Sequence, residues 1–300
     1  MHVRGALLVV CFALAALGGA GSARASELID RNATGVKLAV DTKGRALLTY
    51  RARGRAWRVL VWGAVNARPP HRTVRQVKFR LDYSGGWGTY RTQVWKTFSD
   101  ACAPYDGPAL EWYVTGCRAP DGSYWAIQSW QRMLPNYGLA PTPKQAVWEL
   151  RLSHWRGPLP ELTIKLDWAY RRYDHLYGTY AYLGHPIFGF RVTRTGAPLD
   201  THGRNLYLDT FNSAYGRGWK RENSFLAQNP RGNFCYGFFP HGNRPIGKGE
   251  RYRATIIGPG VTPDVYWESE APGPYNRELD LVANEEQRAI AGTSRYCRPN

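Results

Sequence analysis

The sequence predicts an all-β protein, either an antiparallel β-sandwich or a partly open barrel, rich in Trp and Tyr, with at most one or two short helices. Many short runs alternate apolar and polar residues with a period of two, which is typical of strands with one buried face. Turn signals built from glycine and proline separate these runs. No glycine-rich phosphate loop or alternation of strands and helices accompanies them, which argues against nucleotide chemistry.

The first 25 residues predict an export signal. A short basic start precedes an apolar stretch, Ala6 to Leu17, that is too short to span a bilayer, and Ala23-Arg24-Ala25 is a small-x-small cleavage signal. We expect cleavage near Ala25; an uncleaved membrane anchor is the alternative. No later segment is apolar for long enough to cross a membrane. The mature chain is therefore expected to be secreted and extracellular, with association with the cell wall as an option.

Residues 26–70 predict a β-meander. Three strand-like runs, 36–40, 46–50 and 57–65, are linked by Asp-Thr-Lys-Gly and Arg-Gly and end at Arg68-Pro69-Pro70. This segment is either a small unit of its own or part of the main domain, residues 71–300, because about 40 residues rarely bury enough surface to fold alone.

The main domain contains further alternating runs, at 77–83, 146–152 and 162–168. Their phase places Trp148 and Trp168 on the inward faces of their strands. A helix is expected near residues 280–291, and a short turn near residues 128–134.

Four cysteines remain after the leader, and in an exported chain they predict two disulfides. We favour Cys102–Cys117 and Cys235–Cys297 among the three connectivities. A competing hypothesis makes Cys235 a nucleophile with His241 as its base, which would leave Cys297 unpaired. No pair has C-x-x-C spacing, so a zinc knuckle has no support.

A Leu-Asp dipeptide recurs in the sequence. Leu81 to Tyr90 reads LDYSGGWGTY, Leu166 to Tyr180 reads LDWAYRRYDHLYGTY, and Leu208-Asp209 precedes another glycine-bearing segment. The simplest interpretation is that a strand ends with leucine inward and that the aspartate accepts backbone N–H bonds in the turn.

Aromatic residues are unusually frequent, with 12 Trp and 19 Tyr. Exposed rings beside polar side chains suit sugar faces, since the C–H face of a sugar stacks on the ring. The alternative is that the rings cover the sheet ends as satellite clusters. The candidate binding rings, expected in loops, are Trp87, Tyr90, Tyr124, Trp125, Tyr173, Tyr177, Tyr180 and Trp219.

An enzymatic reading needs two facing carboxylates, for which the sequence offers Glu111, Asp121, Asp174 and Asp209 near aromatics. No G-x-S-x-G or H-E-x-x-H motif supports a serine hydrolase or a zinc protease. We therefore lean toward a protein that is not an enzyme, and we expect no cofactor and no metal site.

The net charge is +17, and the basic residues are dispersed along the chain. Dispersal favours a solvated positive surface over a specific nucleic-acid site, although such a surface is attracted to anionic wall polymers. The leading hypothesis is a non-catalytic binding protein for a cell-envelope or environmental polysaccharide. The alternatives are a glycan-active hydrolase or lyase using a carboxylate pair, and a structural or interaction protein of the cell envelope.

Overall fold

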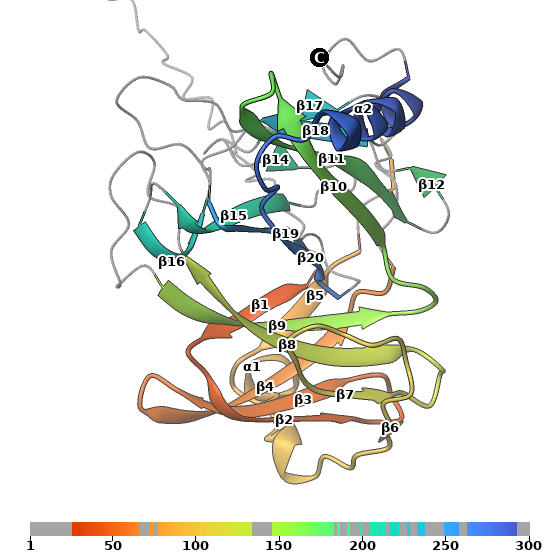
Figure 1. The fold of residues 1–300 in the computed structure, drawn as a ribbon. Helices are drawn as coiled ribbons and strands as arrows, with labels where there is room; N and C mark the ends of the chain where they lie inside the picture. Colours follow the sequence, from red (N-terminus) through yellow and green to blue (C-terminus); the bar gives the residue numbers. More distant parts are fainter. Residues whose placement is uncertain are drawn as a thin grey trace, which may run out of the picture.

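Antiparallel β-sheets form the body of the protein. The computed structural model describes residues 26–66, 73–74, 77–133, 146–182, 185–186, 191–192, 198–199, 205–213, 216–221, 227–228, 233–237, 249–257 and 263–292. Their strands form four sheets whose paired strands all run antiparallel (Figure 1). The expectation of an all-β, sandwich-like fold is confirmed.

The N-terminal sheet has the strand order β2-β3-β4-β5. The predicted meander forms its first three strands, and β5 joins from beyond residue 70, where Phe79 pairs with Gly63. A short helix α1 and a 3-10 turn η1 follow β5. The bounds are β2 Thr34–Val40, β3 Ala46–Ala52, β4 Arg55–Gly63, β5 Phe79–Asp82, α1 Trp87–Tyr90 and η1 Val94–Lys96.

The disulfide sheet has the order β1-β9-β8-β7-β6. The turn expected near residues 128–134 is wrong, because residues up to Met133 continue strand β8 in register with β9. Apolar and ring side chains alternate through this stretch, and pairing on both sides of β8 favours the extended chain over a turn. The bounds are β1 Glu27–Arg31, β6 Ala103–Pro104, β7 Tyr113–Arg118, β8 Tyr124–Met133 and β9 Ala146–Trp155.

The other two sheets come mainly from the second half of the chain. The middle sheet runs β13-β14-β15-β19-β20, with β16 paired to β15. The helix-side sheet runs β10-β11-β18-β17, with β12 paired to β11. The bounds are β10 Glu161–Ala169, β11 Tyr173–Tyr182, β12 His185–Pro186, β13 Arg191–Val192, β14 Pro198–Leu199, β15 Asn205–Ser213, β16 Gly216–Arg221, β17 Ala227–Gln228, β18 Asn233–Gly237, β19 Arg251–Ile257 and β20 Val265–Glu270.

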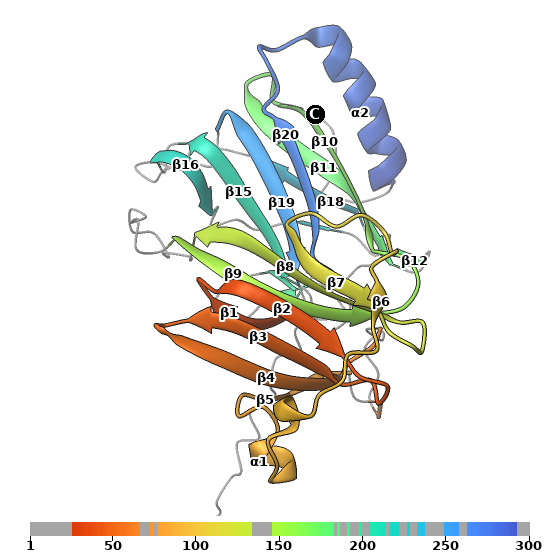
Figure 2. The same ribbon diagram turned by 90° about the horizontal axis from the view of Figure 1, so that it is seen from below.

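The four sheets are stacked in the order N-terminal, disulfide, middle and helix-side, as both views show (Figures 1 and 2). Contacts between β2 and β7, between β16 and β8, and between β10 and β20 join each sheet to the next. One cluster of buried apolar side chains extends through this stack, from Val40 and Leu48 to Leu176 and Tyr252. Residues 26–66 thus share a core with the rest of the described chain.

Helix α2, Arg277–Ala291, lies beside the helix-side sheet. Its position confirms the helix expected near residues 280–291. Asn276 caps it by accepting bonds from the N–H groups of Glu278 (2.9 Å) and Leu279 (3.1 Å). Acidic residues in the first turn suit the positive end of the helix dipole.

Strand β9 is buried on both faces, which the alternating pattern does not predict. Leu150 and Leu152 belong to the apolar core, while Glu149 and Arg151 on the opposite face are also buried. The disulfide sheet lies between two other sheets, so neither face of β9 meets water along its middle. Trp148, expected to point inward, is instead 50% exposed near the beginning of the strand.

Candidate functional site

An open groove of about 700 Å³ lies between helix α2 and strands β10 and β20. Two tryptophans and one tyrosine, Trp168, Trp267 and Tyr177, line it together with acidic, basic and amide side chains. The volume falls in the range of ordinary small-ligand sites. In Figures 1 and 2 the helix lies at one end of the stack, next to β10 and β11.

The ring of Trp168 is fixed in orientation. Its indole N–H donates to the carbonyl oxygen of Gly273 at 2.9 Å, and Tyr275 meets it edge to face at 5.8 Å between ring centroids. Both contacts come from the segment between β20 and α2. Because the indole already has its polar partner, a ligand would meet only the apolar part of this ring.

Charged groups occupy the helix side of the groove. The Lys165 ammonium contacts the Glu286 carboxylate at 2.6 Å, and the Tyr177 hydroxyl donates to the same carboxylate at 3.2 Å. The hydrogen bond from Lys165 lowers the pKa of Glu286 below its ordinary value. Burial raises the pKa of Tyr177, and the charge of Glu286 adds to this effect. Glu286 is therefore an ionised acceptor at neutral pH, and Tyr177 is a neutral donor.

Glu268 is the second carboxylate of the groove, on strand β20. Arg251 forms an ion pair with it, and the Tyr266 hydroxyl donates a hydrogen bond to it. Arg251 also contacts Glu270 at 3.1 Å. These contacts hold the Glu268 carboxylate in place along the strand.

The predicted loop rings do not form one platform. Tyr124 and Trp125 belong to strand β8, Tyr173, Tyr177 and Tyr180 to strand β11, and Trp219 to strand β16, so their placement in loops is wrong. Residues 166–180 belong to a hairpin of β10 and β11 in continuous register. Their rings are strand residues except Tyr170, which lies exposed in the turn.

Burial further separates these rings. Trp125 and Tyr180 are buried in the core, while Tyr177 is buried except where it reaches the groove. Trp219 packs against Phe211 at 5.3 Å, and the guanidinium of Arg253 covers it at 4.5 Å. Of the eight predicted rings, only Tyr177 lines the groove.

Trp87 and Tyr90 are exposed, as predicted, at 53% and 42%. They lie in the short helix α1, at the opposite end of the stack from α2 (Figures 1 and 2). Tyr90 contacts Trp62 at 5.9 Å and the guanidinium of Arg45 at 5.5 Å. These two rings are thus a separate surface from the groove.

The predicted catalytic carboxylates are not brought together. Asp174 accepts a hydrogen bond from Tyr252, and Asp209 binds Arg253. Tyr252 and Arg253 are consecutive in strand β19, so their side chains point to opposite faces of the sheet. Asp174 and Asp209 therefore lie on opposite sides of β19 and do not form a facing pair.

Asp121 and Glu111, the other two predicted carboxylates, lie apart from Asp174 and Asp209 and do not line the groove. Burial acts to raise the pKa of Asp121, but hydrogen bonds from Ser123 and Arg156 outweigh it and lower the pKa to about 2. Glu111 is exposed, and its backbone carbonyl accepts a bond from Gln128 at 2.9 Å.

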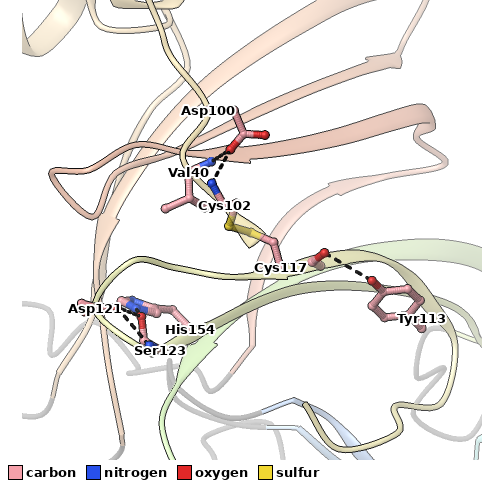
Figure 3. The surroundings of a disulfide bond; sticks show 9 residues. Val40, Asp100, Cys102, Tyr113, Cys117, Asp121, Ser123 and His154 are labelled. Atoms are coloured by element: carbon pink, nitrogen blue, oxygen red, sulfur yellow. Dashed lines mark hydrogen bonds between the residues drawn. A yellow bond between two sulfur atoms is a disulfide. The ribbon is translucent and has the colours of Figure 1, made fainter. Parts of the chain in front are cut away.

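The Cys102–Cys117 disulfide is present as predicted (Figure 3). The carboxylate of Asp100 joins the disulfide segment to the end of β2, because it accepts bonds from the N–H groups of Val40 (2.9 Å) and Cys102 (3.1 Å). Cys235 is also disulfide-bonded, so its role as a thiol nucleophile is wrong. The predicted partner Cys297, and His241, lie outside the described residues.

A buried serine–histidine contact lies in the disulfide sheet and has no motif in the sequence (Figure 3). Nε2 of His154 is 2.8 Å from Oγ of Ser123, and Nδ1 is 2.9 Å from the carbonyl oxygen of Gly63. Burial lowers the pKa of His154 to about 4. The nearby carboxylate, Asp121, accepts from Ser123 at 2.5 Å instead of orienting the histidine, which differs from a catalytic triad.

Within the described ranges, no three His, Cys, Asp or Glu side chains are grouped so that they could hold a metal ion. The helices described are too short or too polar to span a bilayer. Comparison with known proteins finds no matching family, no matching curated protein and no matching solved structure.

Proposed function

We propose that the protein binds a neutral polysaccharide in the groove between α2, β10 and β20, without catalysing a reaction. The observation that carries the proposal is the set of side chains that shares this groove. Trp168 and Trp267 offer apolar ring surface, and Glu286, Lys165 and Asn276 offer hydrogen-bond partners. Sugar recognition needs this combination, since C–H faces stack on rings while hydroxyls need polar partners.

The charges in the groove favour a neutral glycan over an anionic wall polymer. Two carboxylates line the groove, while Lys165 is already paired with one of them. An anionic chain would be repelled there, because like charges close together cost free energy. The positive charge of the whole chain supports a different role, retention near an anionic cell envelope after export.

A glycan hydrolase is the second candidate, because Glu268 and Glu286 line the same groove. A general acid of such an enzyme needs a raised pKa. The pKa of Glu286 is lowered instead, since Lys165 stabilises its charged form. The electrostatics of Glu286 therefore favour binding over acid catalysis.

Titration of tryptophan fluorescence with soluble neutral polysaccharides, at low and high salt, tests the proposal. Trp267→Ala should weaken binding at least about tenfold, which corresponds to ~1.4 kcal/mol of lost stacking and burial. Trp148→Ala is the matched control, because Trp148 is exposed on β9 and does not line the groove.

Three results would count against the groove as the binding site. The first is equal binding by wild type and Trp267→Ala, and the second is loss of binding in Trp87→Ala, which would place the site on the α1 surface. The third is binding of polyanions only, lost at high salt, which would mean that charge alone acts.

Release of reducing ends from the polysaccharide would contradict binding without catalysis and would establish the hydrolase.

A further inference from the structure

Ser26, the first residue described, is completely buried. Its hydroxyl donates a hydrogen bond to Oδ1 of Asp264, 238 positions later in the sequence. Its carbonyl oxygen accepts a bond from Nη1 of Arg151 at 3.2 Å. Ser26, directly before strand β1, is therefore held from two sides. Arg151 on β9 of the disulfide sheet binds its carbonyl, and Asp264, just before β20 of the middle sheet, binds its hydroxyl.

Asp264 is a buried carboxylate held by neutral donors. Ser26 contacts one oxygen, and the indole N–H of Trp130 donates to the other at 3.0 Å. Gln128 binds its backbone, accepting from the N–H at 2.8 Å and donating to the carbonyl at 3.1 Å. Burial raises the pKa of Asp264, although the charge of Arg151 opposes this.

Positive charge is scarce around this carboxylate. Among the described residues, the one cation within 4 Å is Arg151, whose Nε is 3.9 Å from Oδ2 of Asp264. The guanidinium of Arg151 is turned toward Glu149, at 2.6 Å and 3.1 Å. Arg31 reaches Glu149 at 3.5 Å from a half-exposed position. Glu149 and Asp264 are thus buried carboxylates beside the same guanidinium.

The sequence offers a second positive group close to this carboxylate. The small-x-small signal Ala23-Arg24-Ala25 ends directly before Ser26. Hydrolysis of the Ala25–Ser26 peptide bond consumes one water and leaves a carboxylate on Ala25 and an amine on Ser26. With an ordinary pKa near 8, that amine is an ammonium group at neutral pH.

We propose that the leader is removed between Ala25 and Ser26, and that the new α-ammonium group of Ser26 stays buried as the ion-pair partner of Asp264. The nitrogen belongs to the residue whose hydroxyl and carbonyl already contact Asp264 and Arg151, so bond lengths alone keep it within a few Å of the carboxylate. Removing one partner of a buried ion pair is strongly destabilising, because it leaves a buried charge without compensation. Removal of the leader would then complete the junction between the disulfide and middle sheets.

The first test is the mass of the protein exported when the full 300-residue chain is expressed in a bacterial host. A chain that begins at Ser26 is expected. Any other N-terminus, or a chain that keeps its leader, would overturn the proposal.

The second test compares two mature chains, one beginning at Ser26 and one that retains Ala25 as a single extra residue. The chain beginning at Ser26 should melt at least ~5 °C higher, because the extra residue moves the ammonium group away from Asp264. Repeating the comparison in the Asp264→Asn background separates charge from steric fit. The difference should shrink to less than about half there. Equal melting temperatures in the wild-type background, or an undiminished difference with Asp264→Asn, would contradict the ion pair.

The third test is chemical and does not depend on stability. Periodate cleaves the Cα–Cβ bond of an N-terminal serine when its amine and hydroxyl are both accessible. In the chain beginning at Ser26 the native protein should resist the reagent, and the urea-unfolded protein should react. Equal rates in the two states would show that the terminus is exposed and that the proposal is wrong.

Discussion

The hydroxyl of Tyr177 donates to the carboxylate of Glu286 at 3.2 Å and thereby links strand β11 to helix α2 across the floor of the groove. Lys165 contacts the same carboxylate from β10 at 2.6 Å. One acidic side chain on the helix therefore meets two neighbouring strands. Since these strands pair residue by residue from Glu161 to Ala181, the helix is attached to a rigid hairpin.

Glu286→Gln tests what this carboxylate contributes. The amide still accepts from Tyr177 but loses its charge, and Lys165 and Glu286 are each about two-fifths exposed. We expect the free energy of unfolding to change by less than ~1 kcal/mol, because solvent screens such pairs. Urea unfolding measures this. A loss of several kcal/mol would mean that the ion pair holds the helix in place.

The same variant tests whether the charge of Glu286 selects neutral over anionic ligands. A binding site should lose at most about tenfold in glycan affinity, since one hydrogen bond of the carboxylate is weakened. An anionic polymer should bind better than to the wild type, because a negative charge has left the groove. If Glu286→Gln binds polyanions no better than the wild type does, Glu286 does not face the ligand.

His154 should make stability depend on pH. Its pKa in the folded protein is about 4, below the ordinary value of 6.5, because burial disfavours the imidazolium. Between these values the unfolded chain binds a proton that the folded chain does not. The contribution of His154 is therefore fully present above pH 6.5 and is lost as pH falls toward 4, by up to ~3 kcal/mol.

Urea unfolding of wild type and His154→Gln across pH 4 to 7 measures this contribution. As pH falls, the free energy of unfolding of the wild type should decrease relative to that of His154→Gln, because glutamine does not titrate. An NMR titration of the imidazole protons gives the folded pKa directly. A value near 6.5 would contradict the burial of the ring against Trp125, whose centroid lies 3.9 Å away.

The Cys102–Cys117 disulfide should stabilise the protein by about 3 kcal/mol, the entropy of closing a loop of about 15 residues. The Cys102→Ser, Cys117→Ser double variant should lose that amount in urea unfolding. Asp100 would still hold Val40 and Cys102 through backbone bonds, so we expect the N-terminal sheet to keep its pairing. A change below ~1 kcal/mol would contradict loop-closure entropy as the source of stabilisation at this disulfide.

The alternating pattern was sufficient to predict strands, but not which residues their side chains contact. Asp82 accepts from the N–H groups of Ser84 and Thr89, as expected for a turn after Leu81. The other two Leu-Asp aspartates lie inside strands. Asp167 meets His175 at 2.7 Å across its hairpin, and Asp209 meets Arg253. Their partners depend on strand register, which one sequence does not reveal.

The groove could not be predicted for a related reason. Trp168 and Trp267 lie on strands of different sheets, and Glu286 lies on the helix. Period-two alternation states which face of a strand is buried, but not which sheet will cover it. It also assumes that one face of each strand is exposed to solvent. This assumption fails for β9, which lies between two other sheets, and for β11, which helix α2 contacts. The rings of β11 therefore appeared available to a ligand when most of them are core.

The buried pair of Asp209 and Arg253 should be among the most sensitive positions of the middle sheet. Oδ2 of Asp209 accepts from Nη2 of Arg253 at 2.9 Å and from Nε at 3.2 Å, and both side chains are buried. Arg253→Ala leaves a carboxylate without this cation in a dry environment and uncovers Trp219. We expect a loss of about 3–5 kcal/mol in urea unfolding.

A double variant identifies the cause of that loss. Arg253→Met with Asp209→Asn removes both charges and keeps most of the volume, so it should regain at least about half of the stability that Arg253→Ala loses. The fluorescence of Trp219 should shift in the alanine variant and less in the double variant, because methionine still covers the ring. If the double variant is as unstable as Arg253→Ala, packing of the guanidinium against Trp219 is the larger contribution, and the ion pair is not what makes this position sensitive.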